Sequence, residues 1–204
     1  NSSGSPTDLS SYSNNASLVG NAKINNTGMF GNASWFDGTG DYLSLGTPSS
    51  LHPYNFTVMA WIYSTNDSRS TKGIIGRGNQ FSSSKYRLIH DSREIFSLQY
   101  IIFTMSNATA SKSVTTAAFS VPPNRWSHVA CLLNASNTMK CYINGLPSGN
   151  TNTPPNSLVP ENNTFIGTVN SNQGYFNGSI DEVMFFNRSL SDAEIKSLYN
   201  STAT

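Results

Sequence analysis

The stretch of sequence that decides the fold is Phe176-Asn-Gly-Ser-Ile-Asp-Glu-Val-Met-Phe-Phe-Asn-Arg-Ser-Leu-Ser-Asp-Ala-Glu-Ile-Lys-Ser-Leu-Tyr199. Its first part, residues 180–186, is largely apolar, which is typical of a buried strand. A polar turn follows, and residues 192–199 then show the spacing of a short amphipathic helix. The sequence therefore predicts a strand that leads directly into a C-terminal helix.

The start of this helix is marked by two paired signals. Ser191 can cap the helix, and Glu194 three positions later completes a capping box. Leu190 before the cap and Ile195 after it can form the hydrophobic staple that accompanies such a box. We therefore expect the helix to pack against the outside of the sheets that precede it.

Upstream of this stretch, short apolar segments alternate with clusters of Gly, Ser, Asn and Pro that favour turns. Residues 55–63 are apolar at nearly every position, so both faces of that strand should be buried. Similar strands are predicted at 85–90, 95–105, 113–121, 127–133, 139–144 and 164–169, with a loop at 146–160 and an extended or frayed lead-in at 1–14. The pattern predicts an all-β fold: one domain over residues 1–204, built as a two-sheet antiparallel jelly-roll sandwich with one short C-terminal helix.

Four further motifs have a familiar order and spacing: Phe36-Asp-Gly-Thr-Gly-Asp-Tyr-Leu-Ser-Leu45, Phe56-Thr-Val-Met-Ala-Trp-Ile62, Trp126-Ser-His-Val-Ala130 and Met139-Lys-Cys-Tyr-Ile-Asn-Gly145. Together with the closing strand and helix, they resemble laminin G-like domains, a family of the concanavalin A-like lectin and glucanase superfamily that includes the pentraxins. The segment Asp8-Leu-Ser-Ser-Tyr-Ser-Asn-Asn-Ala-Ser-Leu-Val-Gly-Asn21 is similar to the family's opening pattern, although Tyr12 and Ala16 replace glycines there. The resemblance covers nearly the whole chain and implies a binding or adhesion module before it implies an enzyme.

The composition excludes several classes of partner. The chain has 204 residues and a net charge of +1, and only 11% of its residues are charged, against about 25% in an average globular protein. No basic stripe is present for nucleic acid. No apolar run approaches the roughly 18 residues of a membrane-spanning helix, so we expect no membrane span in this chain. Because the chain begins at Asn1 with no Met and no signal peptide, we expect a processed or excised piece of a longer protein.

Sequons of the form Asn-X-Ser/Thr occur twelve times, at Asn1, Asn15, Asn25, Asn32, Asn55, Asn66, Asn107, Asn134, Asn162, Asn177, Asn187 and Asn200. Chance would give roughly six in a chain of this composition. The excess predicts N-glycosylation, and hence an extracellular or cell-surface protein. The sites that we expect to carry glycans are Asn15, Asn25, Asn32, Asn66, Asn107, Asn134, Asn162 and Asn187. The alternative is an Asn-rich polar surface without glycans.

The two cysteines lie in one predicted hairpin. Cys131 is in its first strand and Cys141 in its second, with the turn at residues 134–137 between them. A short loop places the two residues opposite each other on the same face. In an extracellular protein such a pair predicts a disulfide, and the alternative is two buried thiols. Two cysteines at this spacing do not suit zinc.

The sequence offers no set of catalytic residues. Glucanases of the superfamily that the chain resembles use paired carboxylates that share one face of a strand. The only pair on a predicted strand is Asp181-Glu182, whose adjacent side chains point to opposite faces. His128 lies inside a strand, where we expect a hydrogen-bonded structural residue. No Gly-X-Ser-X-Gly, P-loop or His-Glu-X-X-His motif occurs, so we expect no enzymatic activity.

A calcium ion is the best chemical possibility, since many members of the family that the chain resembles bind it. Calcium prefers several carboxylate and carbonyl oxygens. Asp181 on the last strand and Asp8 near the first could meet, and carbonyl groups of the turn near Asn14 could complete the site. The alternative is that Asp181 accepts hydrogen bonds from backbone amides and that no ion is present. We interpret Asp41 as a residue that fixes its turn by hydrogen bonds rather than as a ligand.

Three functions remain open. The first is an extracellular recognition module that binds glycans or protein partners. The second is a structural subunit or decoration of a surface layer, fibre or pilus-like filament, which would form homo-oligomers. The third is an accessory carbohydrate-binding domain of a larger hydrolase. We expect Trp35, Trp61 and Trp126 in the core or at its edge, and the sequence does not identify the exposed aromatic residue that sugar stacking requires.

Overall fold

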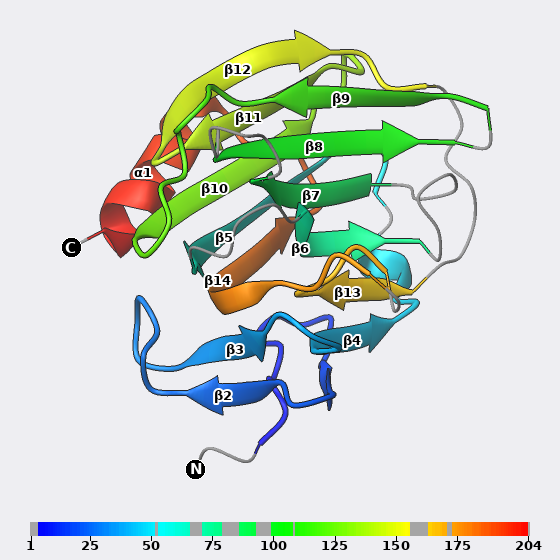
Figure 1. Cartoon of the computed structure of the whole chain (residues 1–204). Helices are drawn as coiled ribbons and strands as arrows, with labels where there is room; N and C mark the ends of the chain where they lie inside the picture. Colours follow the sequence, from blue (N-terminus) through cyan, green and yellow to red (C-terminus); the bar gives the residue numbers. More distant parts are fainter. Residues whose placement is uncertain are drawn as a thin grey trace.

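The computed structural model describes residues 4–51, 53–65, 71–78, 86–92, 99–107, 109–155, 163–170 and 173–203. Two seven-stranded antiparallel sheets face each other, and one helix lies outside them (Figure 1). Sheet A has the order β1 (Ser17–Val19), β4 (Tyr42–Gly46), β13 (Thr164–Ile166), β6 (Thr71–Arg77), β7 (Tyr86–Asp91), β8 (Tyr100–Ser106) and β9 (Ser111–Thr115). Sheet B has the order β12 (Leu146–Asn152), β11 (Met139–Ile143), β10 (Trp126–Leu133), β5 (Phe56–Ser64), β14 (Asn177–Phe186), β3 (Ala33–Asp37) and β2 (Lys23–Asn25). The predicted jelly-roll sandwich is confirmed.

The main core lies between the inner faces of the two sheets. Side chains alternate between the faces of a strand, so every second residue of β5 points inward. Phe56 is one of these, and its ring contacts the rings of Tyr86, Phe103 and Phe185 at centroid distances of 5.1, 6.1 and 5.2 Å. Phe176 is fully buried in the same core. The core is therefore formed by residues that are far apart in the sequence.

A second apolar cluster lies on the outer face of sheet B, beneath α1 (Asp192–Thr202). It contains Met59, Ala130, Leu132, Tyr142, Leu190 and Ile195. At the C-terminal end of the helix, the indole Nε1 of Trp61 donates a hydrogen bond to Thr202 Oγ1 at 3.1 Å. The helix thus covers the outer face of β5, which confirms that this strand is buried on both sides.

The helix begins as its sequence predicts. The Ser191 side chain accepts a hydrogen bond from the Glu194 amide, and the Glu194 carboxylate accepts one from the Ser191 amide. Leu190 and Ile195 both belong to the apolar cluster beneath the helix, as a hydrophobic staple requires. The helix continues to Thr202, three residues beyond the predicted end at residue 199.

The interpretation of residues 146–160 as a loop is wrong for their first part, which forms β12. This strand is largely exposed on both faces, so it shows no alternation of apolar and polar residues. The prediction also lacks β6, where Gly73 and Gly76 interrupt the apolar pattern. A Cβ atom on Gly73 would lie 2.1 Å from the carbonyl carbon of Thr168, so this glycine lets another segment pack directly on the sheet.

Other boundaries differ by a few residues. The segment after the lead-in contains β1 and β2, which are too short to show a periodic pattern. The strand predicted at 113–121 ends at Thr115, and that predicted at 164–169 ends at Ile166. The strand predicted at 95–105 is described from Tyr100, and its residues 95–98 lie outside the described part of the chain.

The hairpin β10–β11 contains the disulfide Cys131–Cys141, with a distance of 4.1 Å between the two Cα atoms. The two cysteines are direct cross-strand partners, as the hairpin pattern predicts. Among the described residues, no helix has the length and apolar character needed to cross a membrane.

Candidate functional site on the outer face of sheet B

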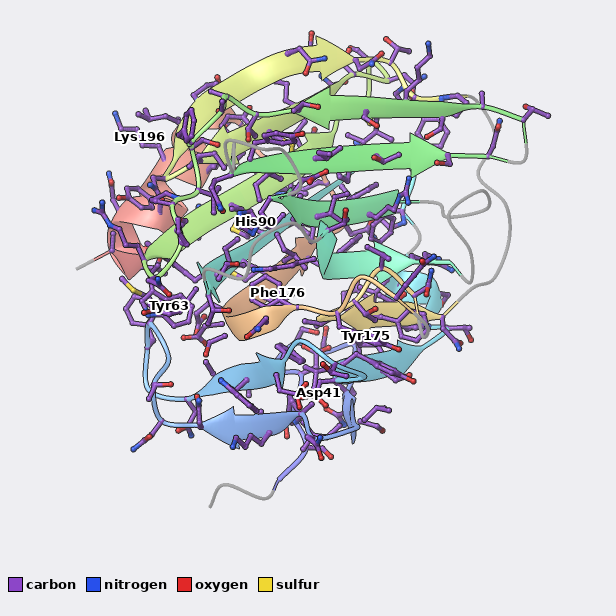
Figure 2. The ribbon with its side chains drawn as sticks, viewed as in Figure 1. Asp41, Tyr63, His90, Tyr175, Phe176 and Lys196 are labelled. Atoms are coloured by element: carbon purple, nitrogen blue, oxygen red, sulfur yellow. A yellow bond between two sulfur atoms is a disulfide. The ribbon has the colours of Figure 1, made fainter. Side chains whose placement is uncertain are left out.

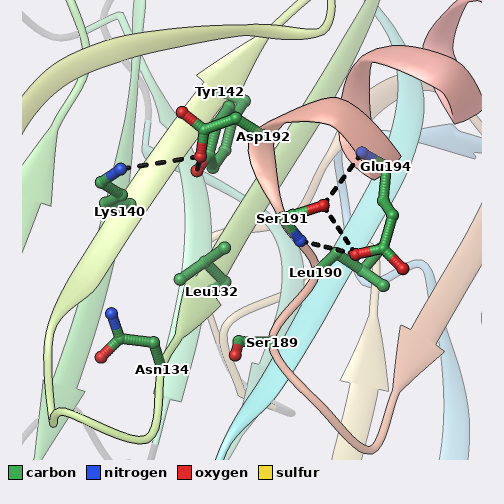
Figure 3. A pocket seen from close by; sticks show the side chains of 9 residues that line it. All are labelled: Leu132, Asn134, Lys140, Tyr142, Ser189, Leu190, Ser191, Asp192 and Glu194. Atoms are coloured by element: carbon green, nitrogen blue, oxygen red, sulfur yellow. Dashed lines mark hydrogen bonds and ion pairs between the residues drawn. The ribbon is translucent and has the colours of Figure 1, made fainter.

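Helix α1 covers only part of the outer face of sheet B and leaves polar and aromatic groups at each of its ends. At its N-terminal end lies a pocket of about 300 Å³ (Figure 3). Its lining consists of Leu132, Asn134, Lys140, Tyr142, Ser189, Leu190, Ser191, Asp192 and Glu194. One wall comes from the hairpin β10–β11 and the other from the turn that leads into the helix. The pocket therefore exists only because the helix packs on this hairpin.

The centre of the pocket is a polar contact between the hairpin and the helix. Tyr142 Oη donates a hydrogen bond to Asp192 Oδ1 at 2.7 Å, and Lys140 Nζ lies 3.6 Å from the same oxygen. Burial, together with the neighbouring Asp192 carboxylate, raises the pKa of the Tyr142 hydroxyl above its ordinary value. The hydroxyl therefore stays protonated and keeps donating to Asp192 at neutral pH.

The rim of the pocket carries a second ion pair. Arg188 Nη2 lies 2.7 Å from Glu194 Oε1, and both side chains are about half exposed. The bond from Arg188, with those from Ser191, lowers the pKa of Glu194 to about 2. The pocket thus presents carboxylate, ammonium, amide and hydroxyl groups beside the apolar side chains of Leu132 and Leu190. Such a lining suits a small ligand that is rich in hydroxyl groups.

At the other end of α1, five side chains lie in one row across sheet B. Trp126 of β10 is the cross-strand partner of Tyr63 on β5, and Tyr63 is the partner of Ser179 on β14. Ser179 in turn pairs with Trp35 on β3, and Trp35 pairs with Lys23 on β2. All five point outward, because the alternate side of each strand faces the core, through Ala22, Phe36, Ile62, Val129 and Ile180. We call these five residues the cross-strand row.

The row remains accessible beside the helix. Trp35, Tyr63 and Trp126 are partly exposed, whereas Trp61, two residues before Tyr63, is 4% exposed beneath the helix. Tyr63 lies at the margin of the molecule in Figure 2. Its ring centroid is 5.7 Å from that of Trp126.

Polar groups flank the aromatic rings of the row. Lys23 Nζ lies 4.3 Å from the centre of the Trp35 ring, a cation–π contact. Asp37 and Asn177 are cross-strand partners further along β3 and β14, and both are partly exposed. Their side chains also point outward, so they border the row. The arrangement combines flat apolar surfaces with hydrogen-bonding groups at the edge.

The residues predicted to bind calcium lie in two separate networks. Asp8 Oδ2 accepts a hydrogen bond from the Asn14 amide at 2.8 Å, and Asp8 Oδ1 accepts one from the Ser10 amide at 2.9 Å. The structure therefore brings Asp8 and Asn14 together in one turn. Burial is the largest single influence on the pKa of Asp8 and acts to raise it, but the hydrogen bonds from Ser10 and Asn14 together lower that pKa below its ordinary value.

Asp181 belongs to a different network. Its carboxylate accepts hydrogen bonds from the amides of Phe30 at 3.0 Å and Glu182 at 2.9 Å, while burial raises its pKa above the ordinary value. Within the described parts of the chain, no three His, Cys, Asp or Glu residues form a group that could hold a metal ion. Calcium requires oxygen ligands, whereas these neighbours are N–H groups. They do not fit an ion shared by Asp8 and Asp181, and calcium binding stays a prediction.

The predicted sequons occupy several kinds of position. Asn15, Asn32 and Asn187 are exposed, and Asn25, Asn107 and Asn134 are partly exposed. Asn66 and Asn162 lie outside the described residues. Asn134 differs from the others because its side chain also lines the pocket. Glycosylation at all these sites stays a prediction.

The carboxylates and the histidine of sheet B show no catalytic arrangement among the described residues. Asp181 is buried and Glu182 exposed, and the pairing of β14 with β5 shifts register after Asp181. His128 is buried beneath α1, with its ring centroid 5.4 Å from Trp61 and 5.8 Å from Tyr199. Its backbone amide donates to Asn144 Oδ1, but its ring Nδ1 is buried without a hydrogen-bond partner in the described structure. The sequence predicts a hydrogen-bonded structural residue at this position. The prediction is confirmed for the backbone amide of His128 but not for its ring Nδ1.

Comparison with known proteins places these features in a family. A family model of laminin G type, described as the concanavalin A-like lectin/glucanases superfamily, matches residues 37–196. No curated protein matches the chain. Similar solved structures include the binding domain of botulinum neurotoxin DC in complex with SialylT, at 18% identity and a TM-score of 0.72, covering 96% of this chain and 48% of that one.

Two further solved structures are similar to this chain to about the same extent. A structure of botulinum neurotoxin type C, described as dependent on two ganglioside molecules for cell entry, shows 18% identity and a TM-score of 0.72, covering 96% of this chain and 48% of that one. The receptor-binding domain of the C/D mosaic serotype shows 19% identity and a TM-score of 0.73, with the same coverages. This chain therefore spans about half the length of these domains. At such identities the likeness shows the fold alone.

Proposed function

This chain belongs to the concanavalin A-like lectin/glucanases superfamily, and from that premise we propose that it is a non-catalytic carbohydrate-binding module. The observation that carries the proposal is the cross-strand row on the outer face of sheet B. A sugar ring has a C–H face that packs well on an aromatic ring, and hydroxyl groups that need hydrogen-bond partners. The row supplies both kinds of surface.

The dimensions of the row favour an extended oligosaccharide over a single sugar. Neighbouring strands lie about 4.8 Å apart, so four steps between five strands extend over about 19 Å. Trp35 and Tyr63 are separated by the small side chain of Ser179 on β14, which is 5% exposed. Lys23, Asp37 and Asn177 can bind hydroxyl groups along the border.

The similar structures support a glycan as the class of ligand. They do not indicate where on this chain it would bind. Two similar structures are described with SialylT or with ganglioside molecules, both glycan ligands of those proteins. Since this chain matches only about half of each domain, their ligands indicate a class of recognition and no particular subsite. The disulfide and the predicted sequons support a module that works outside the cell.

The test is a glycan array followed by titration of a bound oligosaccharide against single variants. We expect Trp35→Ala and Trp126→Ala each to weaken binding about tenfold or more, because buried aromatic contacts dominate such interfaces. Tyr54→Ala is the matched control, since Tyr54 is 76% exposed and lies outside the row. Equal affinities for Trp35→Ala and Tyr54→Ala would refute the row as the site. Hydrolysis of the bound glycan by the isolated chain would refute a purely binding role.

A further inference from the structure

Asn134 is both a sequon residue and part of the wall of the pocket beside α1. Three hydrogen bonds fix it in the turn of the hairpin β10–β11. Its amide donates to Thr138 O at 3.0 Å, and its carbonyl oxygen accepts from the Asn137 amide at 3.0 Å. Its side-chain Oδ1 accepts from the Thr138 amide at 2.9 Å. The side-chain nitrogen Nδ2, the atom that N-glycosylation modifies, makes none of these bonds.

Because Oδ1 is bound by the turn, Nδ2 points to the other side of the side chain. Figure 3 shows the Asn134 nitrogen on the side that faces Lys140 and Leu132, which are walls of the pocket. We propose that Asn134 is N-glycosylated and that the sugar attached to it occupies this pocket. The inference does not depend on the proposed function, because the sugar is part of the chain itself.

The modification preserves the local structure. In the reaction, Nδ2 loses a proton and bonds to the anomeric carbon of an oligosaccharide carried on a lipid diphosphate, and the lipid diphosphate leaves. The product is still an amide with an intact Oδ1, so the hydrogen bond from the Thr138 amide remains. Glycosylation therefore fits the existing turn without unfolding the hairpin.

The pocket has the size and chemistry for one attached sugar. Its volume of about 300 Å³ is at the lower end for small-molecule sites. Leu132 and Leu190 provide apolar contacts for the ring face and for any acetyl methyl group. Lys140, Asp192 and Ser191 provide groups that can bind hydroxyls. A sugar held here would contact both the hairpin and the start of α1, and would stabilise the packing of the helix.

The experiment compares Ser136→Ala with the parent chain, each produced both in a host that N-glycosylates and in one that does not. The substitution removes the sequon but leaves Asn134 in its turn, because Ser136 is exposed. In the glycosylating host we expect a glycan at Asn134 by mass spectrometry. We also expect Ser136→Ala to lose about 2–4 °C in melting temperature, and to lose nothing in the other host. The control is Ser17→Ala, which removes the exposed Asn15 sequon and should leave the melting temperature unchanged in both hosts.

A second measurement tests whether the sugar lies in the pocket. If it does, Lys140→Ala and Ser136→Ala act on the same contact, and their effects on melting temperature are not additive in the glycosylated protein. In the protein without glycans, the two effects should add. An unmodified Asn134 would overturn the proposal, as would equal losses for Ser136→Ala and Ser17→Ala. Additive effects in both hosts would show a glycan that points away from the pocket and would also overturn it.

Discussion

One edge of the sandwich is closed by side chains and the opposite edge by a turn. At the first edge, β9 of sheet A lies against β12 of sheet B, although the two strands are separated by β10 and β11 in the sequence (Figure 1). At the second edge, β1 and β2 belong to different sheets but follow one another directly along the chain. Both edges leave backbone groups that would otherwise attract another strand. The two edges differ in sequence separation. The strands that meet at the first edge are far apart in the chain, whereas those at the second edge are consecutive.

The edge between β9 and β12 is joined by alternate side chains of β12. Ser148 Oγ accepts from the Ala117 amide at 3.2 Å, Asn150 Oδ1 accepts from the Thr115 amide at 2.8 Å, and Asn152 Nδ2 donates to Ser113 O at 3.0 Å. Residues two apart share one side of a strand, so all three reach the same neighbour. Polar side chains thus replace the missing ladder of backbone bonds.

The strands approach each other closely between these contacts. Gly149 has a positive φ of +86°, and a Cβ atom there would lie 1.9 Å from Thr115 O. Only glycine fits a position with both properties. The polar composition of β12, which conceals it as a strand in the sequence, is therefore what closes this edge.

The edge between β1 and β2 depends on one buried carboxylate. Asp41 is fully buried and lies close to the N-terminal strands (Figure 2). Its Oδ1 accepts from the Asn21 amide at 2.5 Å and its Oδ2 from the Asp37 amide at 3.0 Å. A single residue thus fixes the turn between β1 and β2 to the end of β3. This agrees with the interpretation of Asp41 as a residue that fixes its turn.

The largest expected effect is therefore at the second edge. Asp41→Ala leaves the part-buried amides of Asn21 and Asp37 without their carboxylate acceptor, and each lost bond to a charged group costs about 1.5–3 kcal/mol. We expect a loss of about 4 kcal/mol in the free energy of unfolding, measured in urea. Asp37→Ala is the control, because the Asp37 carboxylate accepts only exposed hydrogen bonds, from the Thr39 amide at 2.7 Å and from Asn21 Nδ2 at 3.4 Å. A loss below about 1 kcal/mol for Asp41→Ala would show that this carboxylate does not hold the turn between β1 and β2 in place.

The next largest effect that we expect is a loss of stability at acidic pH. This loss should begin at α1, which covers His128. Burial lowers the pKa of His128 from 6.5 to about 4. Between these two pH values the unfolded chain binds a proton that the folded chain excludes, so stability is complete above pH 6.5 and declines as the pH falls towards 4. At about 1.4 kcal/mol per pH unit, the total loss is about 3 kcal/mol.

Hydrogen exchange at pH 5 can locate this effect. After correction for the intrinsic exchange rate at each pH, the amides of α1 should be less protected at pH 5 than at pH 7, whereas the protection of those of β9 should change little, because the side chains of β12 that bind β9 are neutral. The variant His128→Gln, which cannot be protonated in this range, is the control and should lose the acid sensitivity. A loss of protection in β9 before α1 would contradict this order.

These examples show which features the sequence could predict. The strand and helix over 176–199 depend on local signals, namely a capping box and an apolar pattern, and both are present. The contribution of Asp41 is local for one partner only, because the Asp37 amide lies four positions away along the chain and the Asn21 amide lies 20 positions away. The strand β12 and the cross-strand row have no local signal. Trp35, Tyr63 and Trp126 become neighbours only through the register of β3, β14, β5 and β10.

The pocket shows the same limit. Ser191 and Glu194 are recognisable from the sequence as helix-capping residues. Lys140 and Tyr142, which form the opposite wall, are about 50 positions earlier and become neighbours only when α1 packs on sheet B. A sequence pattern predicts each wall as part of an element, but the space between them depends on tertiary packing.

A smaller effect is expected at the edge between β9 and β12. Asn150→Ala removes one neutral hydrogen bond to a largely exposed strand, which typically contributes about 1 kcal/mol. The Thr115 amide should then exchange faster with solvent, and the protein should associate more readily because the edge of β9 is open. Thr151→Ala is the matched control, since its side chain points to the other side of β12. Equal exchange rates of the Thr115 amide in both variants would show that Asn150 does not protect this edge.

The smallest expected effect is that of calcium, which could act only near β1 and β14. Asp8 and Asn14 lie in the turn before β1, and Asp181 is bound to the amides of Phe30 and Glu182. An ion would have to replace these N–H groups, so we expect any rise in melting temperature in calcium, relative to chelator, to be small. If calcium did bind, the gain would follow occupancy, at about 2.7 kcal/mol when its concentration is a hundredfold the dissociation constant. A rise in melting temperature that Asp181→Asn abolishes would therefore establish the calcium site predicted from the sequence, and would show that the turn before β1 rearranges to form it.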